Sequence, residues 1–136
     1  MLVFLVLGTM PAAACDLKVT DAWIREAPPG LMTLAGYASL HNDSGKLLQI
    51  VKVWSASFAE IQMHESVIEN GMASMREIST LNIPAHQQVM FAPSGRHFML
   101  MGATRGFSKG EAVEISLQDQ HGCTTVARFI VRSDGS

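Results

Sequence analysis

The stretch AVEISLQDQHGCTTVARFIV, residues 112–131, decides the fold of this chain. Its first half alternates strictly, with Val113, Ile115 and Leu117 on one face and Glu114, Ser116 and Gln118 on the other. The turn signal His121-Gly122 separates this segment from Thr124–Val131, which is rich in β-branched and aromatic residues. Because a period of two is typical of a strand with one buried face, the stretch predicts an antiparallel hairpin.

The same pattern recurs along the chain. Short runs rich in β-branched and aromatic residues are separated by Gly, Pro, Asn and Asp, and no long window keeps a 3.6-residue period. The expected strands are Leu17–Ile24, Leu34–His41, Leu47–Trp54, Glu60–Ser66, Met72–Ile78, Gln88–Phe91, Phe98–Ala103, Ala112–Gln118 and Thr124–Val131. Many short strands at this spacing predict an all-β fold, either a two-sheet, immunoglobulin-like β-sandwich or a small barrel.

The first fourteen residues have the pattern of an export signal. Leu2–Leu7 forms a short apolar segment, and Ala12–Ala14 supplies the small residues of a cleavage site before Cys15. The apolar run is too short to span a bilayer as a helix, so no membrane span is expected. Residues 15–136 are then expected to form a single domain of about 120 residues, enough to bury a core without help from a metal.

Charge and cysteine content narrow the possible partners and the compartment. The net charge is −2 and the basic residues are scattered, which argues against nucleic acid as a partner. The two cysteines, Cys15 and Cys123, are expected to form a disulfide in an oxidising compartment. Two free buried thiols, or acylation of Cys15, are the alternatives. C-x-x-C spacing is absent, so a catalytic redox pair is not expected.

Four residues form the candidate metal site: His64, Met75, His97 and Met99. Taken singly, a Met in an apolar strand is usually core filler and a lone His is usually a surface residue. Together, two thioethers and two imidazoles favour copper, above all Cu(I), over Mg, Ca or Mn. His97 and Met99 are two residues apart on an expected strand, so their side chains share one face.

The turn Asn70-Gly71 relates the positions of His64 and Met75. It suits a two-residue type I′ hairpin, in which residues whose numbers sum to 141 face each other. Met75 is then opposite Ser66, and His64 is diagonal to Met75 on the same face. Diagonal neighbours lie about 7–8 Å apart, within reach of long side chains that bind one ion.

At these positions the chain resembles the periplasmic copper chaperones of the PCuAC type, whose hallmark is His, ten residues, Met, twenty-one residues, His, one residue, Met. His64, Met75, His97 and Met99 match every interval. Further segments that look like the family are Asp21–Arg25, Gly36–Ala38, Met63–Glu65, Ile83–Ala85 and His97–Met101. The resemblance implies a cupredoxin-like β-sandwich that holds Cu(I) near its surface. It also implies delivery towards the CuA centre in subunit II of cytochrome c oxidase, often alongside a Sco-type protein.

The other methionines near the candidate site, and the two tryptophans, have different expected roles. Met101 and Met72 are candidate spare thioethers, whereas Met63 is expected in the core. Trp23 and Trp54 are also expected to anchor the core.

Two His and two Met form a neutral ligand set, which favours Cu(I), and the lack of a cysteine in the set argues against a blue-copper centre. A periplasmic, monomeric metallochaperone that is not an enzyme is the function expected. The alternative is a copper scavenger or buffer without a dedicated acceptor. Two hypotheses belong to other functional classes: a copper oxygenase, which is an enzyme, and an interaction module with incidental His and Met residues. The oxygenase is disfavoured because the predicted mature N-terminus, Cys15, offers no N-terminal His ligand.

Overall fold

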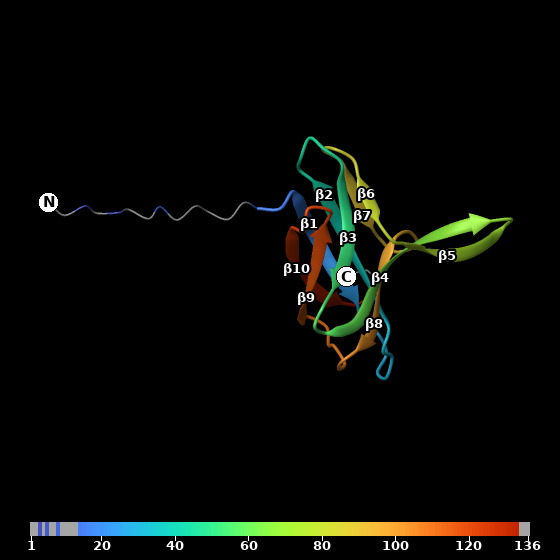
Figure 1. Cartoon of the computed structure of the whole chain (residues 1–136). Helices are drawn as coiled ribbons and strands as arrows, with labels where there is room; N and C mark the ends of the chain where they lie inside the picture. The colour runs from blue at the N-terminus through green and yellow to red at the C-terminus, as the bar shows by residue number, and fades with distance from the viewer. Residues whose placement is uncertain (1–2, 4, 6–7, 9–13, 134–136) are drawn as a thin grey trace.

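Ten β-strands make up the regular structure in the computed structural model, which describes residues 3, 5, 8 and 14–133 (Figure 1). The strands are β1 (Leu17–Arg25), β2 (Leu34–Asn42), β3 (Leu48–Trp54), β4 (Phe58–Glu69), β5 (Met72–Ile78), β6 (Leu81–Ile83), β7 (Gln88–Phe91), β8 (His97–Ala103), β9 (Ala112–Asp119) and β10 (Thr124–Arg132). The predicted leader, residues 1–14, lies almost wholly outside the described residues. None of the described residues belongs to a helix that could span a lipid bilayer.

The strands form the two layers of a β-sandwich, joined through β1. The hydrogen-bonded order is β5-β4-β8-β2-β1-β10-β9-β3-β6, and β7 adds to β2 beyond the part of β2 that pairs with β8. β1 pairs antiparallel with β2 on both sides of an irregularity between Thr20 and Trp23. From Trp23 onward β1 also pairs parallel with β10, so its last residues have a partner strand on each side. Asp21 has a φ of 50° at this irregularity. The all-β, immunoglobulin-like sandwich predicted from the sequence is therefore confirmed.

The core lies between the two layers and is built from buried residues of every strand except β5. Phe98 is at its centre, with ring centroids 4.3 Å from Phe91 and 5.9 Å from Phe129. Val113, Ile115 and Leu117 are buried, as the alternation in residues 112–131 predicts. That hairpin, β9–β10, pairs in one continuous antiparallel register.

The structure differs from the sequence-based prediction at three places. The short strand β6 was not predicted, because three residues are too few to show a period. The β4–β5 hairpin is longer than predicted and projects from the sandwich (Figure 1). Trp23 and Trp54 were wrongly placed in the core. They are only half-buried, because neighbouring residues such as Ile24 take the inward positions.

A disulfide joins Cys15, just before β1, to Cys123, just before β10. The Cα atoms are 5.8 Å apart, although 108 residues separate the two cysteines in the sequence. The bond ties the start of β1 to the start of β10, where the two strands are not yet paired with each other. It also uses the sulfur atom that acylation of Cys15 would require.

Asn42, at the end of β2, holds the loop that leads to β3. Its amide nitrogen donates to the backbone carbonyls of Lys46, Ile83 and Pro84 at 2.7, 2.9 and 3.1 Å. Its amide oxygen accepts from the backbone N–H and the hydroxyl of Ser44. The side chain is 1% exposed, so Asn42 is a structural residue and its amide is not accessible for glycosylation.

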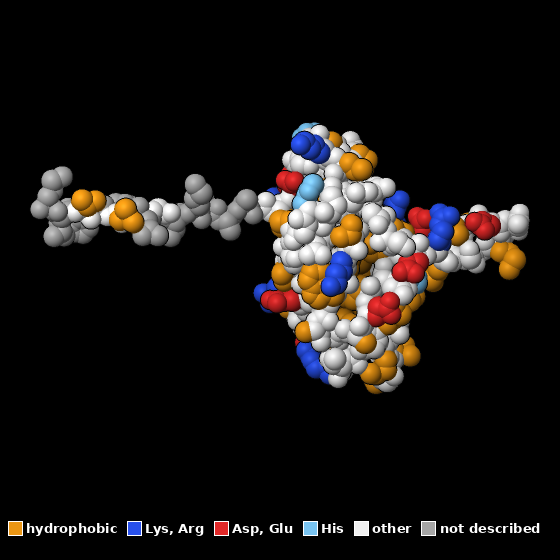
Figure 2. All heavy atoms as spheres, viewed as in Figure 1, with side chains coloured by type: hydrophobic (Ala, Val, Ile, Leu, Met, Phe, Trp, Pro, Cys, Tyr) orange, Lys and Arg blue, Asp and Glu red, His pale blue; other side chains and the backbone are white. Residues whose placement is uncertain are grey.

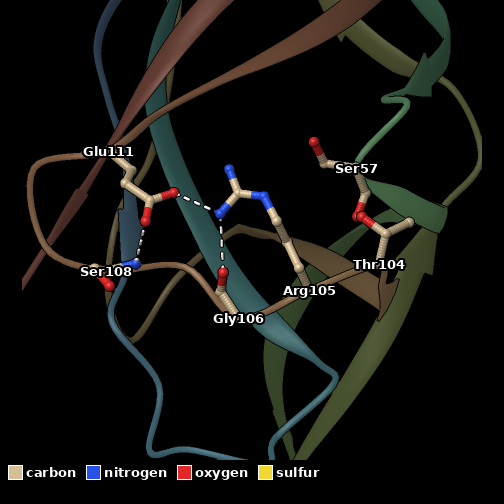
Figure 3. A network of polar contacts seen from close by, with 6 residues as sticks. All are labelled: Ser57, Thr104, Arg105, Gly106, Ser108 and Glu111. Atoms are coloured by element: carbon tan, nitrogen blue, oxygen red, sulfur yellow. Dashed lines mark hydrogen bonds and ion pairs between the residues drawn. The ribbon is translucent and has the colours of Figure 1, made fainter.

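A second polar network closes the loop between β8 and β9 (Figure 3). Arg105 Nη1 donates to Glu111 Oε2 at 2.6 Å and to the carbonyl of Gly106 at 2.9 Å. The hydrogen bond from Arg105, followed by that from the backbone of Ser108, lowers the pKa of Glu111 below its ordinary value. This network lies at the end of β8 remote from His97.

Replacing both Cys15 and Cys123 by serine is expected to lower the free energy of unfolding by about 2 to 5 kcal/mol, since the bond closes a long loop in the unfolded chain. Chemical denaturation of the two proteins measures this difference. Thiol titration of the native wild-type protein without reductant should read near zero. Two reactive thiols in that titration would contradict the disulfide.

Asn42→Ala is expected to destabilise the fold by about 2 to 4 kcal/mol, because it leaves buried carbonyls without a donor. Asn82→Ala is the matched control, since Asn82 makes an exposed hydrogen bond to Gln49. The control should change stability by less than about 0.5 kcal/mol. Equal effects of the two substitutions in urea denaturation would refute the role given to Asn42.

Candidate metal centre

The antiparallel pairing of β4 with β8 builds the candidate site. In this register His64 lies opposite His97, Gln62 opposite Met99, and Glu60 opposite Met101. The intervening residues face the core, where Ile61, Met63, Phe98 and Leu100 are all buried. Since side chains alternate between faces, burial of these apolar residues directs the two histidines and Met99 to the outer face.

The two imidazoles are direct neighbours on this face. Their ring centroids are 5.5 Å apart and the planes are inclined by 61°. Both side chains are half-buried. Met99, which lies two residues beyond His97 on the same face of β8, is also half-buried. Residues that are distant in the sequence thus bring two nitrogen donors and one sulfur donor together.

Met75 reaches the same face through the β4–β5 hairpin. Asn70 and Gly71 have φ values of 51° and 76°, as a type I′ turn requires. Met75 pairs with Ser66 and is diagonal to His64, so the register predicted from the turn is confirmed. Unlike the other three residues, Met75 is largely exposed, at 63%.

A chain of polar side chains runs along the outer face of β4 and ends at His64. His64 Nε2 is 2.8 Å from Gln62 Oε1, and Gln62 Nε2 donates to Glu60 Oε1 at 2.9 Å. His64 Nδ1 is buried and has no hydrogen-bond partner among the described residues. A buried nitrogen in this state fits a ligand that binds a metal, because coordination uses the same lone pair.

Gln62 and Glu60 were missed in the sequence analysis. The period of two along β4 places both of them on the His64 face, so the alternation itself was the available signal. What the alternation does not reveal is that their side chains bond to each other and to His64.

Three further methionines differ in their position relative to the candidate site. Met101 is half-buried on the same face of β8 as Met99 and is paired with Glu60. Met72 pairs with Glu69, on the hairpin face opposite to Met75, which argues against a role as a spare ligand. Met63 is 5% exposed and belongs to the core, as expected.

The charged face of the hairpin is separate from the candidate ligands. Arg76 pairs with Glu65 across the two strands, and Arg96 Nε lies 4.0 Å from the same carboxylate. Side chains of both signs are visible on the hairpin in Figure 2. Because Glu65 adjoins His64 on β4, it points to the opposite face. The positive charge of Arg96 therefore faces Glu65 rather than the imidazoles.

Solved structures that share this fold include PCuAC domains. The copper-bound PCuAC domain from PmoF2 has a TM-score of 0.75 and 21% identity, covering 89% of this chain and 96% of its own. The Cu(I) form of DR1885 from Deinococcus radiodurans has a TM-score of 0.70 and 28% identity, covering 92% and 84%. The apo form of DR1885 has a TM-score of 0.69 and 26% identity, covering 99% and 91%.

The family follows from the sequence comparison. Residues 17–131 match the family profile described as "Putative lipoprotein LpqE-like". The chain is also 30% identical over 113 residues to "Putative lipoprotein Lxx21020" of Leifsonia xyli subsp. xyli (strain CTCB07), covering 82% of this chain and 67% of that protein. The chain belongs to the LpqE-like family, and its fold is that of PCuAC domains, as the resemblance of the four-residue pattern implies.

The surroundings of His97 disfavour its protonation. Burial lowers its pKa from the ordinary value of 6.5, a hydrogen bond to the backbone of Gly95 opposes this shift, and the neighbouring His64 lowers the pKa further. This shift favours the neutral form of His97, which is the form in which an imidazole coordinates a metal.

In the metal-free protein, we expect the NMR titration of the His97 ring to have its midpoint below pH 6.5. His64→Phe keeps an aromatic ring beside His97 and removes the second charge, so the midpoint should rise relative to the wild type. The unfolded chain binds this proton more readily, so His97 also lowers stability as the pH falls from 6.5 towards the folded pKa. A midpoint at or above 6.5 in the wild type would contradict this description of the site.

Proposed function

We propose that this protein is a periplasmic Cu(I)-binding metallochaperone that delivers copper towards the CuA centre of cytochrome c oxidase. One observation carries the proposal: the β4–β8 register places His64 opposite His97, with Met99 and Met75 on the same face. The ligands proposed are His64, Met75, His97 and Met99. The Cu(I)-bound state of DR1885 supports the choice of ion.

The donor set explains the preference for Cu(I). Two imidazoles and two thioethers are all neutral, so they do not offset the charge of Cu(II) as thiolates or carboxylates would. Both cysteines are in the disulfide, beside strands β1 and β10, so neither is available as a thiolate for this site. This ligand set suits binding and release of an ion better than a permanent electron-transfer centre.

The uneven exposure of the four residues suggests how copper is released. His64, His97 and Met99 are half-buried and held by paired strands, whereas Met75 stands on the exposed strand β5. An acceptor can therefore replace the Met75 thioether first and take the ion from the remaining three ligands stepwise. In this mechanism the protein exchanges ligands and catalyses no reaction, so the role is not enzymatic.

Location and partners complete the proposal. The predicted leader and the disulfide support an exported protein in an oxidising compartment. The name of the relative from Leifsonia xyli points to lipoproteins. In this chain, however, Cys15 is bonded to Cys123, which supports a protein that is not acylated at Cys15. We assign the role to a monomeric domain of residues 15–136, with oxidase subunit II and a Sco-type protein as partners.

A scavenger or buffer would use the same ligands without a dedicated acceptor. A transfer experiment distinguishes the two roles: the Cu(I)-loaded protein is mixed with an isolated, copper-free subunit II domain. Transfer that is faster than release to a small-molecule chelator of equal affinity supports the chaperone. Equal rates support the buffer.

Replacing both Met75 and Met99 by leucine is expected to abolish high-affinity Cu(I) binding, because leucine keeps the volume and removes the sulfur. The matched control replaces Met32 and Met90, which are also exposed, at 53% and 55%, and are not among the proposed ligands. Competition with a Cu(I) chelator measures both affinities, and thermal unfolding checks that both variants fold. A small and equal effect of the two double substitutions would exclude the thioethers as ligands.

A further inference from the structure

We propose that Gln62 is a positioning residue of the copper site, which together with Glu60 fixes the ring of His64 so that Nδ1 receives the metal. The inference rests on the proposed function and adds to it the nitrogen atom that coordinates and the residues that select it.

The orientation of the Gln62 amide follows from its two partners. The Glu60 carboxylate can only accept, so the amide NH2 group of Gln62 must face it, at 2.9 Å. The amide oxygen is then the atom that faces His64 Nε2, at 2.8 Å. Because an oxygen only accepts, Nε2 must carry the proton of the neutral ring. The lone pair is therefore on Nδ1.

His64 Nδ1 is the second observation that points to a ligand. It is buried, and no hydrogen-bond partner is present among the described residues. A buried acceptor without a partner is costly, and it is seldom left in that state without a role. The neighbouring ring of His97, with centroids 5.5 Å apart, provides the next donor. A metal ion held by His64 would have His97 as its nearest second imidazole donor.

The strand register also places Gln62 next to a second proposed ligand. It pairs with Met99, so it stands beside one proposed ligand while its amide holds another. A hydrogen bond to the nitrogen that does not coordinate is the usual way in which proteins fix the tautomer and orientation of a ligating histidine. The carboxylate of Glu60 strengthens this arrangement, since it orients the amide in turn.

The experiment uses the whole protein with ¹⁵N-labelled histidine, at about pH 8, where an imidazole of ordinary pKa is neutral. The metal-free wild type should show His64 protonated on Nε2, and Cu(I) should shift the Nδ1 resonance. Gln62→Leu should give a mixture of tautomers and weaken Cu(I) binding by about 10- to 100-fold.

Two further variants separate positioning from mere packing. The exchange E60Q/Q62E keeps the charge and the chain of hydrogen bonds. The amide introduced at position 60 would donate to the carboxylate introduced at position 62, and that carboxylate would accept from His64 Nε2. The exchange should restore most of the affinity and the Nε2–H tautomer. Gln88→Leu, an exposed glutamine on β7, is the control and should change neither.

Each outcome of these experiments supports or overturns the role proposed for Gln62. Unchanged affinity and an unchanged tautomer in Gln62→Leu would overturn the proposal, as would a Cu(I)-induced coordination shift on Nε2 instead of Nδ1. Failure of the wild type to bind Cu(I) would instead overturn the proposed function. In that case, a mixed His64 tautomer in the metal-free wild type would show that the geometry assigned to Gln62 is wrong as well.

Discussion

The register between β4 and β8 is the constraint on which the rest of the site depends. It is set by burial: Met63 and Phe98 are paired and lie in the core, and so do Ile61 and Leu100. A slip of one residue would turn these apolar side chains to solvent and the histidines into the core. The hydrophobic effect that stabilises the sandwich therefore also holds His64 opposite His97.

Folding and binding are divided between different parts of the molecule. The disulfide and the buried Asn42 fix the strand ends and loops far along the chain from the histidines, and neither contributes to the candidate site. The candidate ligands lie on the outer face and at an exposed hairpin. The strands that hold these candidate ligands do not depend on a bound ion for their pairing. Met75 is exposed at 63%, more than the half-buried His64, His97 and Met99.

Local patterns in the sequence predicted much of this correctly. The composition and alternation of residues 112–131 predicted β9, β10 and the shared face of Val113, Ile115 and Leu117 in β9, and Asn70-Gly71 predicted a type I′ hairpin with Met75 opposite Ser66. These features depend on residues close together in the chain. The pairing of Cys15 with Cys123 was also expected, although it rested on the compartment and on there being only two cysteines.

The sequence by itself determined nine of the ten strands, the Asn70-Gly71 turn and which residues are the candidate donors. Only the tertiary structure decided that His64 stands opposite His97, because that contact depends on which strands become neighbours in the sheet. For the same reason the sequence did not predict the chain of hydrogen bonds from Glu60 through Gln62 to His64, or the half-buried positions of Trp23 and Trp54. A period of two assigns side chains to two faces. Packing of the two layers decides which face is buried and what lies beside it.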